Sequence, residues 1–498
     1  MMKKFTQLRV LVLMVVLALL AGLALSQTAF TNQGQPQAGR AVKGAKRAGE
    51  QRGQRPVPVN SDEMPEVGQE SVAGAAPDQA GWLLTGNAGT MPGIHFLGTT
   101  DNTALEIKVN NERALRLEPA EHPQLGFSPN LIGGFSDNSV TAGVVGATIS
   151  GGGNPGFDNR VTDHFGTVGG GRKNQAGDAT TTDNIAATVC GGSANTASGD
   201  HSAVSGGSDN TASGFVSTVG GGGLNMASGF AATVAGGSRN TASSLQSTVS
   251  GGEGNTASGD YSTVAGGLQN MASGLRAVVG GGVMNMASGD HATVGGGFRN
   301  TASGLRATVA GGDGNTALGN FSLAAGRSAK ANHLGAFVWA DAFGTDFAST
   351  ADNQFNVRTS GGARIFSNTA ATTGVRLAPG GNSWMGASDR HLKENFTPVD
   401  GRQILHKLSL IPITRWNLKS QDPSIWHLGP TAQDFHAAFG LGEDDRYITG
   451  SDADGIALVS IQALYEMSLE KDRQIEELQQ RIKRLELMVE TLMKKEAR

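Results

Sequence analysis

The sequence predicts a mainly β protein of 498 residues: a parallel β-solenoid of 15-residue repeats between two β-hairpins, then a small α+β domain and a C-terminal coiled coil. Asn occurs nine times in succession at a spacing of 15 residues, and such a short fixed period is typical of stacked coils. Glycine becomes sparse and charged residues become frequent after Ala387. Apolar residues near the C-terminus then alternate at spacings of three and four, which predicts a coiled coil.

Residues 1–26 are predicted to be a secretory signal peptide. Lys3 and Lys4 precede a 16-residue apolar run, Val10–Leu25, and small residues up to Ser26 offer a cleavage site. An uncleaved anchor is the alternative, although 16 residues are few for a spanning helix. We therefore expect a secreted or cell-surface protein with no membrane span after the signal is removed.

Residues 27–80 are predicted to form a disordered basic linker, because they are rich in Gln, Gly, Pro and Ala and contain several Arg and Lys residues. Ordered structure is expected from Trp82 onward, in an N-terminal hairpin cap at 81–130. Its strands would be 105–109 and 113–117, which alternate apolar and polar residues around an Asn-Asn-Glu turn.

A second hairpin is expected in a neck at 346–387, with strands 355–358 and 363–366 around Ser360-Gly361-Gly362. The two hairpins would flank the solenoid and cover its open strand edges, which would otherwise invite aggregation.

The repeat region, 131–345, has constant columns of small residues and variable columns. Ala recurs from Ala197 to Ala317 and Val recurs from Val204 to Val309, and both columns are predicted to face inward. The Asn column is predicted to form a hydrogen-bonded ladder in this thin core, with a ligand role as the alternative. Because Ala and Val bury little area, several chains are expected to associate side by side.

The repeat Asn-x-Ala-x-Gly-x-x-Ser/Thr-x-Val-x-Gly-Gly resembles the head repeat of trimeric autotransporter adhesins, and so does the terminating run Ala325–Asn332. This resemblance implies a left-handed parallel β-roll, a homotrimer, and a surface glycan or protein as ligand. The repeat is one residue longer than is usual in that family, which we attribute to the Gly-Gly corner.

A Ser and a Lys of the C-terminal domain lie close together in the sequence, at Ser388 and Lys393. Such a pair can act as nucleophile and general base if the amine is desolvated.

The run Ser388-Asp389-Arg390-x-Leu392-Lys393-Glu394-Asn395, followed by the stretch from His427 to Asp434, resembles the endosialidase-type intramolecular chaperone domain of phage tailspikes and fibres. The resemblance implies that residues 388–466 drive trimerisation and then cut themselves off. It gives Ser388 the role of nucleophile and Lys393 the role of general base, with cleavage next to Ser388. Of the two adjoining bonds, Ala387–Ser388 is the easier to reach, because Ser388 Oγ approaches the preceding carbonyl through a five-membered ring. For His427, orientation of this pair and a structural hydrogen bond remain open alternatives.

Residues 467–498 are predicted to form the coiled coil. Its seam consists of apolar residues at the a and d positions: Ile475, Leu478, Ile482, Leu485, Val489 and Leu492. Ile at a with Leu at d favours a dimer, whereas Arg481–Glu486 resembles a pattern of parallel trimers. Because the β-roll family is also trimeric, we expect a trimer.

Several functions are disfavoured by the sequence. A net charge of −4 argues against nucleic-acid binding, and no pattern for a metal, a nucleotide or another cofactor occurs. The expected chemistry is at most a single-turnover serine autoproteolysis without an external substrate. Alternatives to an adhesin-like fibre are an inert spacer and an ice- or lattice-binding solenoid with Thr rows such as Thr218, Thr233 and Thr248. Cys190 is expected to be a buried small residue.

Overall fold

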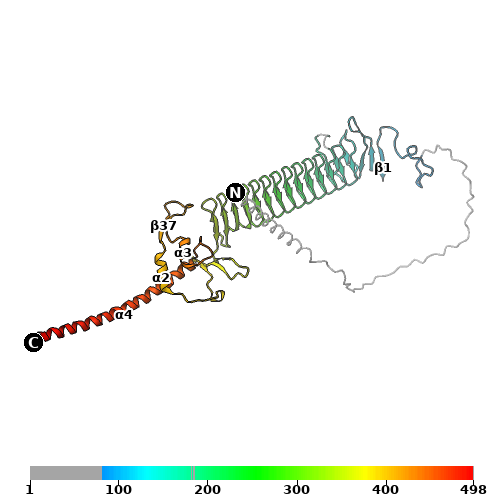
Figure 1. The fold of residues 1–498 in the computed structure, drawn as a ribbon. Coiled ribbons are helices and arrows are strands. Elements are labelled where there is room, and N and C mark those ends of the chain that lie inside the picture. The colour runs from blue at the N-terminus through cyan, green and yellow to red at the C-terminus, as the bar shows by residue number, and fades with distance from the viewer. Residues whose placement is uncertain (1–80, 181, 183–184, 497–498) are drawn as a thin grey trace, which may run out of the picture. The chain divides into compact units, whose positions relative to one another are not determined.

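The computed structural model describes residues 81–180, 182 and 185–496 (Figure 1). The predicted signal peptide at 1–26 and linker at 27–80 lie outside the described residues. The chain divides into two compact units, Met1–His95 and Phe96–Arg498. In the first unit, the described residues 81–95 form turns without a helix or a strand. No helix among the described residues has the length and apolar composition needed to cross a membrane.

Phe96–Arg498 contains the predicted solenoid, and within the described residues its larger sheet has 17 strands. From β5 onward each strand pairs in parallel with the strand one coil further along, while β1, β2 and β5 pair antiparallel. The strands are β1 (Leu105–Val109), β2 (Glu112–Glu118), β5 (Asn130–Gly133), β7 (Thr148–Ile149), β9 (Thr167–Val168), β11 (Thr188–Val189), β13 (Ala203–Val204), β15 (Thr218–Val219), β17 (Thr233–Val234), β19 (Thr248–Val249), β21 (Thr263–Val264), β23 (Val278–Val279), β25 (Thr293–Val294), β27 (Thr308–Asp313), β29 (Leu323–Arg327), β31 (Phe337–Ala340) and β33 (Phe355–Arg358).

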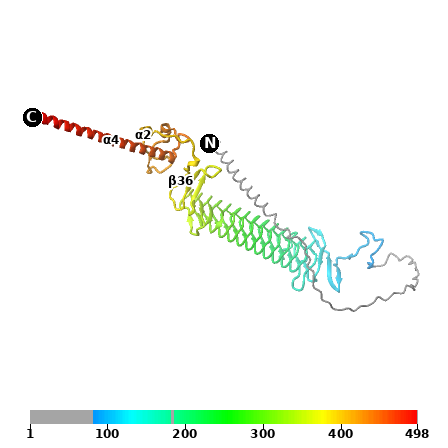
Figure 2. The ribbon, with the colours of Figure 1, turned by 90° about the horizontal axis from the view of Figure 1, so that it is seen from below.

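The second sheet of the solenoid is entirely parallel and has 14 strands in the described part of the chain. Figure 2 shows the coils of the two sheets stacked along one axis. The strands of this sheet are β6 (Ser139–Val140), β8 (Arg160–Val161), β10 (Gln175–Ala176), β12 (Thr196–Ala197), β14 (Thr211–Ala212), β16 (Met226–Ala227), β18 (Thr241–Ala242), β20 (Thr256–Ala257), β22 (Met271–Ala272), β24 (Met286–Ala287), β26 (Thr301–Ala302), β28 (Thr316–Ala317), β30 (Ala329–Ala331) and β32 (Phe347–Ala348).

A third row of single bridges joins the coils between the two sheets, from Arg172 through Ser208 and Leu268 to Asp313. The row begins one residue after the Gly-Gly corner of each coil. In the pairing of β27 with β29, Val309 faces Ala324 and Gly311 faces Ala325, so one residue between them has no partner. The extra residue of that repeat, Ala310, therefore lies directly before the Gly-Gly corner, whereas the sequence analysis attributed it to the corner itself.

The core of the solenoid consists of the predicted small columns. The Val side chains from Val204 to Val309 and the Ala side chains from Ala197 to Ala317 have no exposed surface. The Asn side chains lie in the same interior, with exposed fractions of 0–1%. Inward columns of one residue type arise because a 15-residue period places equivalent residues directly above one another.

The Asn column is a hydrogen-bonded ladder. Asn255 Nδ2 donates to Gly251 O of its own coil and to Gly267 O of the next coil, both at 2.9 Å. Its Oδ1 accepts from the backbone N–H of Asn270 at 2.9 Å. The same pattern recurs from coil to coil, so both amide protons and the oxygen of each side chain are used within the solenoid. This arrangement supports the structural interpretation over the ligand role.

The corners of the coils are not held by glycine alone. A Cβ on Gly207, where φ is +90°, would lie 2.1 Å from Gly222 O, so this column tolerates only glycine. Two further corner columns have positive φ but are filled by other residues, for example His201 at +54° and Asp209 at +55°. Each such residue costs about 1–2 kcal/mol relative to a relaxed backbone. The variable columns of the sequence are largely these exposed corner positions.

The two ends of the solenoid differ. At the N-terminal end β1 and β2 pair antiparallel around Asn110 and Asn111, which both have positive φ. The short pair β3 (Glu121–His122) and β4 (Gly126–Phe127) follows.

At the C-terminal end the predicted hairpin of 355–358 with 363–366 is wrong. Strand β33 pairs in parallel with β31 as a further coil, and Phe355 stacks on Phe337 with ring centroids 4.7 Å apart. Strand β34 (Ala363–Phe366) pairs instead with β35 (Gly374–Leu377), which also pairs with β36 (Trp384–Gly386).

Arg358 fixes the last coil. Its Nε donates to Asp341 Oδ1 at 2.9 Å, and its other nitrogens donate to the carbonyls of Thr345 and Phe343 at 2.6 Å. The pKa of Asp341 is lowered to about 2, mainly because its carboxylate accepts hydrogen bonds from Ser360 and secondarily from Arg358. These bonds hold the loop between β31 and β32 against β33, the last strand of the larger sheet.

The C-terminal region is α+β. Its elements are η1 (Arg390–Leu392), α2 (Gly401–Leu410), β37 (Thr414–Trp416), β38 (His427–Gly429), α3 (Ala432–Phe439) and α4 (Gly450–Glu496). Asp400 caps α2, Thr431 caps α3, and Gly440 ends α3 in a left-handed conformation. Helix α2 packs on α4, where Arg402 forms an ion pair with Glu470. Helix α4 has 47 residues and includes the whole predicted coiled-coil seam.

Candidate functional site

The predicted nucleophile and base of the C-terminal domain lie next to each other. Lys393 Nζ donates a hydrogen bond to Ser388 Oγ at 2.7 Å. Both side chains are exposed in the single chain. The arrangement has the hydrogen bond that a Ser–Lys pair needs. The Lys393 amine must also be shielded from water to act as a base, and a single chain does not shield it.

A single helical turn makes this contact. Asp389 Oδ1 accepts from the backbone N–H of His391 at 2.9 Å and caps η1, and the Lys393 N–H bonds to Arg390 O at the end of the turn. The turn folds the chain back so that residues five apart meet. The Arg390 guanidinium lies over the ring of Phe396, 5.1 Å from its centroid. Asp389 and Arg390 therefore have structural roles in this turn.

His427 interacts with residues of its own β-hairpin and not with the Ser388–Lys393 pair. It starts β38, opposite Trp416 of β37, and the two rings stack with centroids 4.8 Å apart. Its Nε2 is 2.8 Å from Gln421 Oε1. Among the described residues no hydrogen bond joins His427 to Ser388 or Lys393. The structure brings two of the three predicted residues together and gives the third a hydrogen bond within its own hairpin, with Gln421 as a partner that the sequence analysis did not anticipate.

The surface of the solenoid was the other candidate site. The Thr row that suggested lattice binding is half-buried on the outward side of the larger sheet, and Ala203 and Val278 interrupt it.

The prediction that Cys190 is buried is wrong. Cys190 follows the inward Val189, and its thiol is exposed. The alternation of a strand explains this: neighbours of an inward residue face outward.

Comparison with known proteins agrees with this picture at the C-terminus. Residues 388–440 match the model of a family described as chaperone of endosialidase. The match begins at the predicted nucleophile and ends at Gly440, the residue that terminates α3. No curated protein matches the chain. The chain thus joins a β-solenoid to a segment similar to the chaperone of endosialidase, which confirms the resemblance predicted from its sequence.

Proposed function

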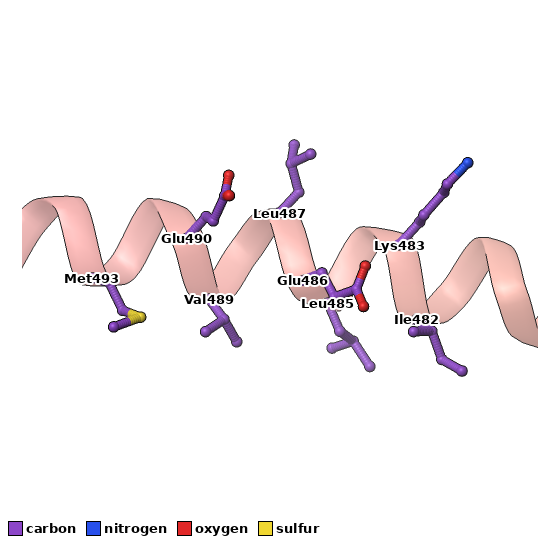
Figure 3. Close-up of a pocket in the computed structure, with 8 residues that line it drawn as sticks. All are labelled: Ile482, Lys483, Leu485, Glu486, Leu487, Val489, Glu490 and Met493. Carbon is purple, nitrogen blue, oxygen red and sulfur yellow. The ribbon is translucent and has the colours of Figure 1, made fainter.

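We propose that this protein is a secreted or surface-displayed homotrimeric fibre, adhesin-like in its solenoid, whose C-terminal domain chaperones its assembly. The observation that carries this proposal is the unpartnered seam of α4. Its six apolar side chains, from Ile475 to Leu492, are 51–62% exposed. Figure 3 shows Ile482, Leu485, Val489 and Met493 on one side of the helix.

The C-terminal region as a whole supports the same proposal, because it has almost no core of its own. Between residues 388 and 496 the buried residues are Ile411, Phe435, Ile456, Ser460 and Ala463. Large apolar side chains such as Leu410 and Leu428 are 70% and 72% exposed. Burial of a Leu or Ile side chain contributes about 1.5–3 kcal/mol, so contacts between copies would supply the stability that one chain lacks.

We further propose that the assembled domain cleaves the chain before Ser388. Neutral Lys393 Nζ takes the proton of Ser388 Oγ, and the oxygen attacks the carbonyl carbon of Ala387. The C–N bond breaks, the proton passes to the leaving nitrogen of Ser388, and Ala387 is held as an ester on Oγ. Water hydrolyses this ester, which leaves a carboxylate on Ala387 and restores the serine hydroxyl. Trimerisation would shield the amine from water and favour its neutral form.

Expression of the full chain beside Ser388→Ala and Lys393→Met variants tests the cleavage. The parent is expected to give a fragment of residues 388–498 on a denaturing gel, and both variants are expected to stay full-length. His427→Gln serves as the comparison, because its interactions lie within its own hairpin, and it should still be cut. A full-length parent, or a variant that is cut as fast as the parent, contradicts the proposed protease.

A size measurement on the same samples separates cleavage from assembly. Sedimentation of the Ser388→Ala chain as a trimer would support the chaperone role whatever the gel shows, whereas a monomer or a stable dimer would contradict it.

For the solenoid we propose a surface glycan or protein as the ligand, which would bind at the exposed corner columns. An inert spacer is the alternative, and binding of the full chain to an array of surface glycans distinguishes the two.

A further inference from the structure

Three exposed methionines gather on two neighbouring coils of the solenoid. Met271 of β22 and Met286 of β24 are direct partners in the parallel ladder, and the Met271 N–H donates to Asn285 O at 2.8 Å. Met284 lies two residues before Met286, at a corner position with positive φ, and its side chain is also exposed. The exposed fractions of Met271, Met284 and Met286 are 39%, 43% and 39%.

We propose that Met271, Met284 and Met286 form a binding site for a soft monovalent cation, Cu(I) or Ag(I). Neighbouring strands of a sheet are about 4.8 Å apart, and an unbranched methionine side chain has three rotatable bonds. Three thioether sulfurs can therefore converge on one ion. Thioethers are among the ligands that select Cu(I).

The surroundings of the three thioethers also favour a soft ion over a hard one. Leu268 and Phe298 lie on either side of Val283 in the row of bridges next to the methionines, so the rim is apolar. The Arg299 guanidinium lies over the ring of Phe298, 4.6 Å from its centroid, where the ring face stabilises its charge. Within the described residues no group of three or more His, Cys, Asp or Glu side chains is placed to hold a metal ion, so Ca²⁺ and Zn²⁺ lack their preferred ligands.

The chain contains a matched control in the same column. Met226 of β16 is 41% exposed, but its partners in the ladder are Thr211 and Thr241. It has the same backbone environment as Met271 and Met286 without a thioether beside it on the neighbouring strands. A site built from neighbouring thioethers therefore predicts different roles for Met226 and Met286.

Calorimetric titration of the full chain with Ag(I) tests the site. The titration uses a Cys190→Ser background, because the exposed thiol of Cys190 would itself bind silver. The parent is expected to bind one Ag(I) per chain, and Met286→Leu should weaken this binding by at least about tenfold, since one of three ligands is lost. Met226→Leu should leave the affinity unchanged. Leu keeps the volume of the side chain, so both variants should fold.

Met284→Gly is a second variant, and a loss of silver binding by this variant could not be explained by unfolding. Met284 has φ of +55°, and glycine already occupies its column at Gly254 and Gly314 with φ of +65°. This variant should therefore fold at least as well as the parent and still lose the silver affinity. Absence of Ag(I) binding by the parent, equal losses in the Met226→Leu and Met286→Leu variants, or equally tight Zn²⁺ binding at these residues would each overturn the proposal.

Discussion

Asn255 is typical of the buried Asn column and makes its bonds with backbone groups on both sides. If Asn255→Ala removes them, the buried Asn270 N–H and the half-buried Gly251 carbonyl lose their partners. Each unpaired buried group costs about 1–3 kcal/mol, so we expect the free energy of unfolding to fall by about 3 kcal/mol. Chemical denaturation followed by circular dichroism measures the change.

The control for this prediction is Asn320→Ala. Asn320 Oδ1 also accepts a backbone N–H, that of Leu305 at 3.0 Å, but at an exposed corner where water can replace it. Its loss should change the free energy of unfolding by less than about 1 kcal/mol. Equal losses in the two variants would contradict the role given to the buried ladder.

Buried serines of one column differ in their bonding. Ser217 Oγ is buried and, within the described part of the chain, has no hydrogen-bond partner, whereas Ser322 Oγ donates to Gly319 O at 2.6 Å. Ala already occupies this column at Ala232 and Ala277. Ser217→Ala should therefore raise the free energy of unfolding by about 1 kcal/mol, and Ser322→Ala should lower it by about 1 kcal/mol. Denaturation curves of the two variants should shift in opposite directions, and shifts of the same sign would refute this argument.

At the scale of elements, the β3–β4 hairpin meets the solenoid through two histidines. The rings of His122 and His164 are 4.7 Å apart and edge-to-face, and His164 Nδ1 accepts the Val145 N–H at 3.2 Å. Burial, and to a lesser extent the nearby His122, lower the pKa of His164 below its usual 6.5. The unfolded chain therefore takes up this proton at a higher pH than the folded chain does.

Because the pKa of His164 is lower in the folded chain than in the unfolded chain, the stability of this region depends on pH. Stability associated with His164 is fully present above the unfolded pKa of 6.5 and is lost as the pH falls from there through the lower folded pKa. We expect hydrogen exchange at the Val145 amide, corrected for its intrinsic rate, to accelerate between about pH 7.5 and pH 5. His164→Gln should remove this dependence, while His406→Gln, an exposed residue of α2, should retain it. A dependence that survives His164→Gln would assign the effect to another group.

If the copies fold together, the stability of the whole molecule depends on the contacts between chains as well as on those within one chain. Leu485 occupies a d position of the seam and is 60% exposed on the single helix. Leu485→Asp would place a carboxylate in the proposed trimer interface, so we expect the assembly to dissociate in sedimentation experiments. Gln480→Asp, at an f position outside the seam, should leave the trimer intact. A trimer that survives Leu485→Asp would mean that α4 does not hold the copies together.

The sequence by itself determined the features that local patterns encode. The 15-residue spacing placed the Asn, Ala and Val columns inside, because equivalent positions of stacked coils must coincide. The contact of Ser388 with Lys393 was also within reach, since one short turn joins residues five apart. Both predictions depended on residues close together in the chain or related by a fixed period.

Only the tertiary structure decided the features that join distant residues or depend on a particular strand partner. It gave β33 a partner in the solenoid instead of the expected hairpin, because Phe355 finds Phe337 one coil away. It brought His122 to His164, and it put Met271 beside Met286 but Met226 beside threonines. Strand pairing and ring contacts are chosen by the packing of whole coils, and no short-range pattern in the sequence encodes that choice.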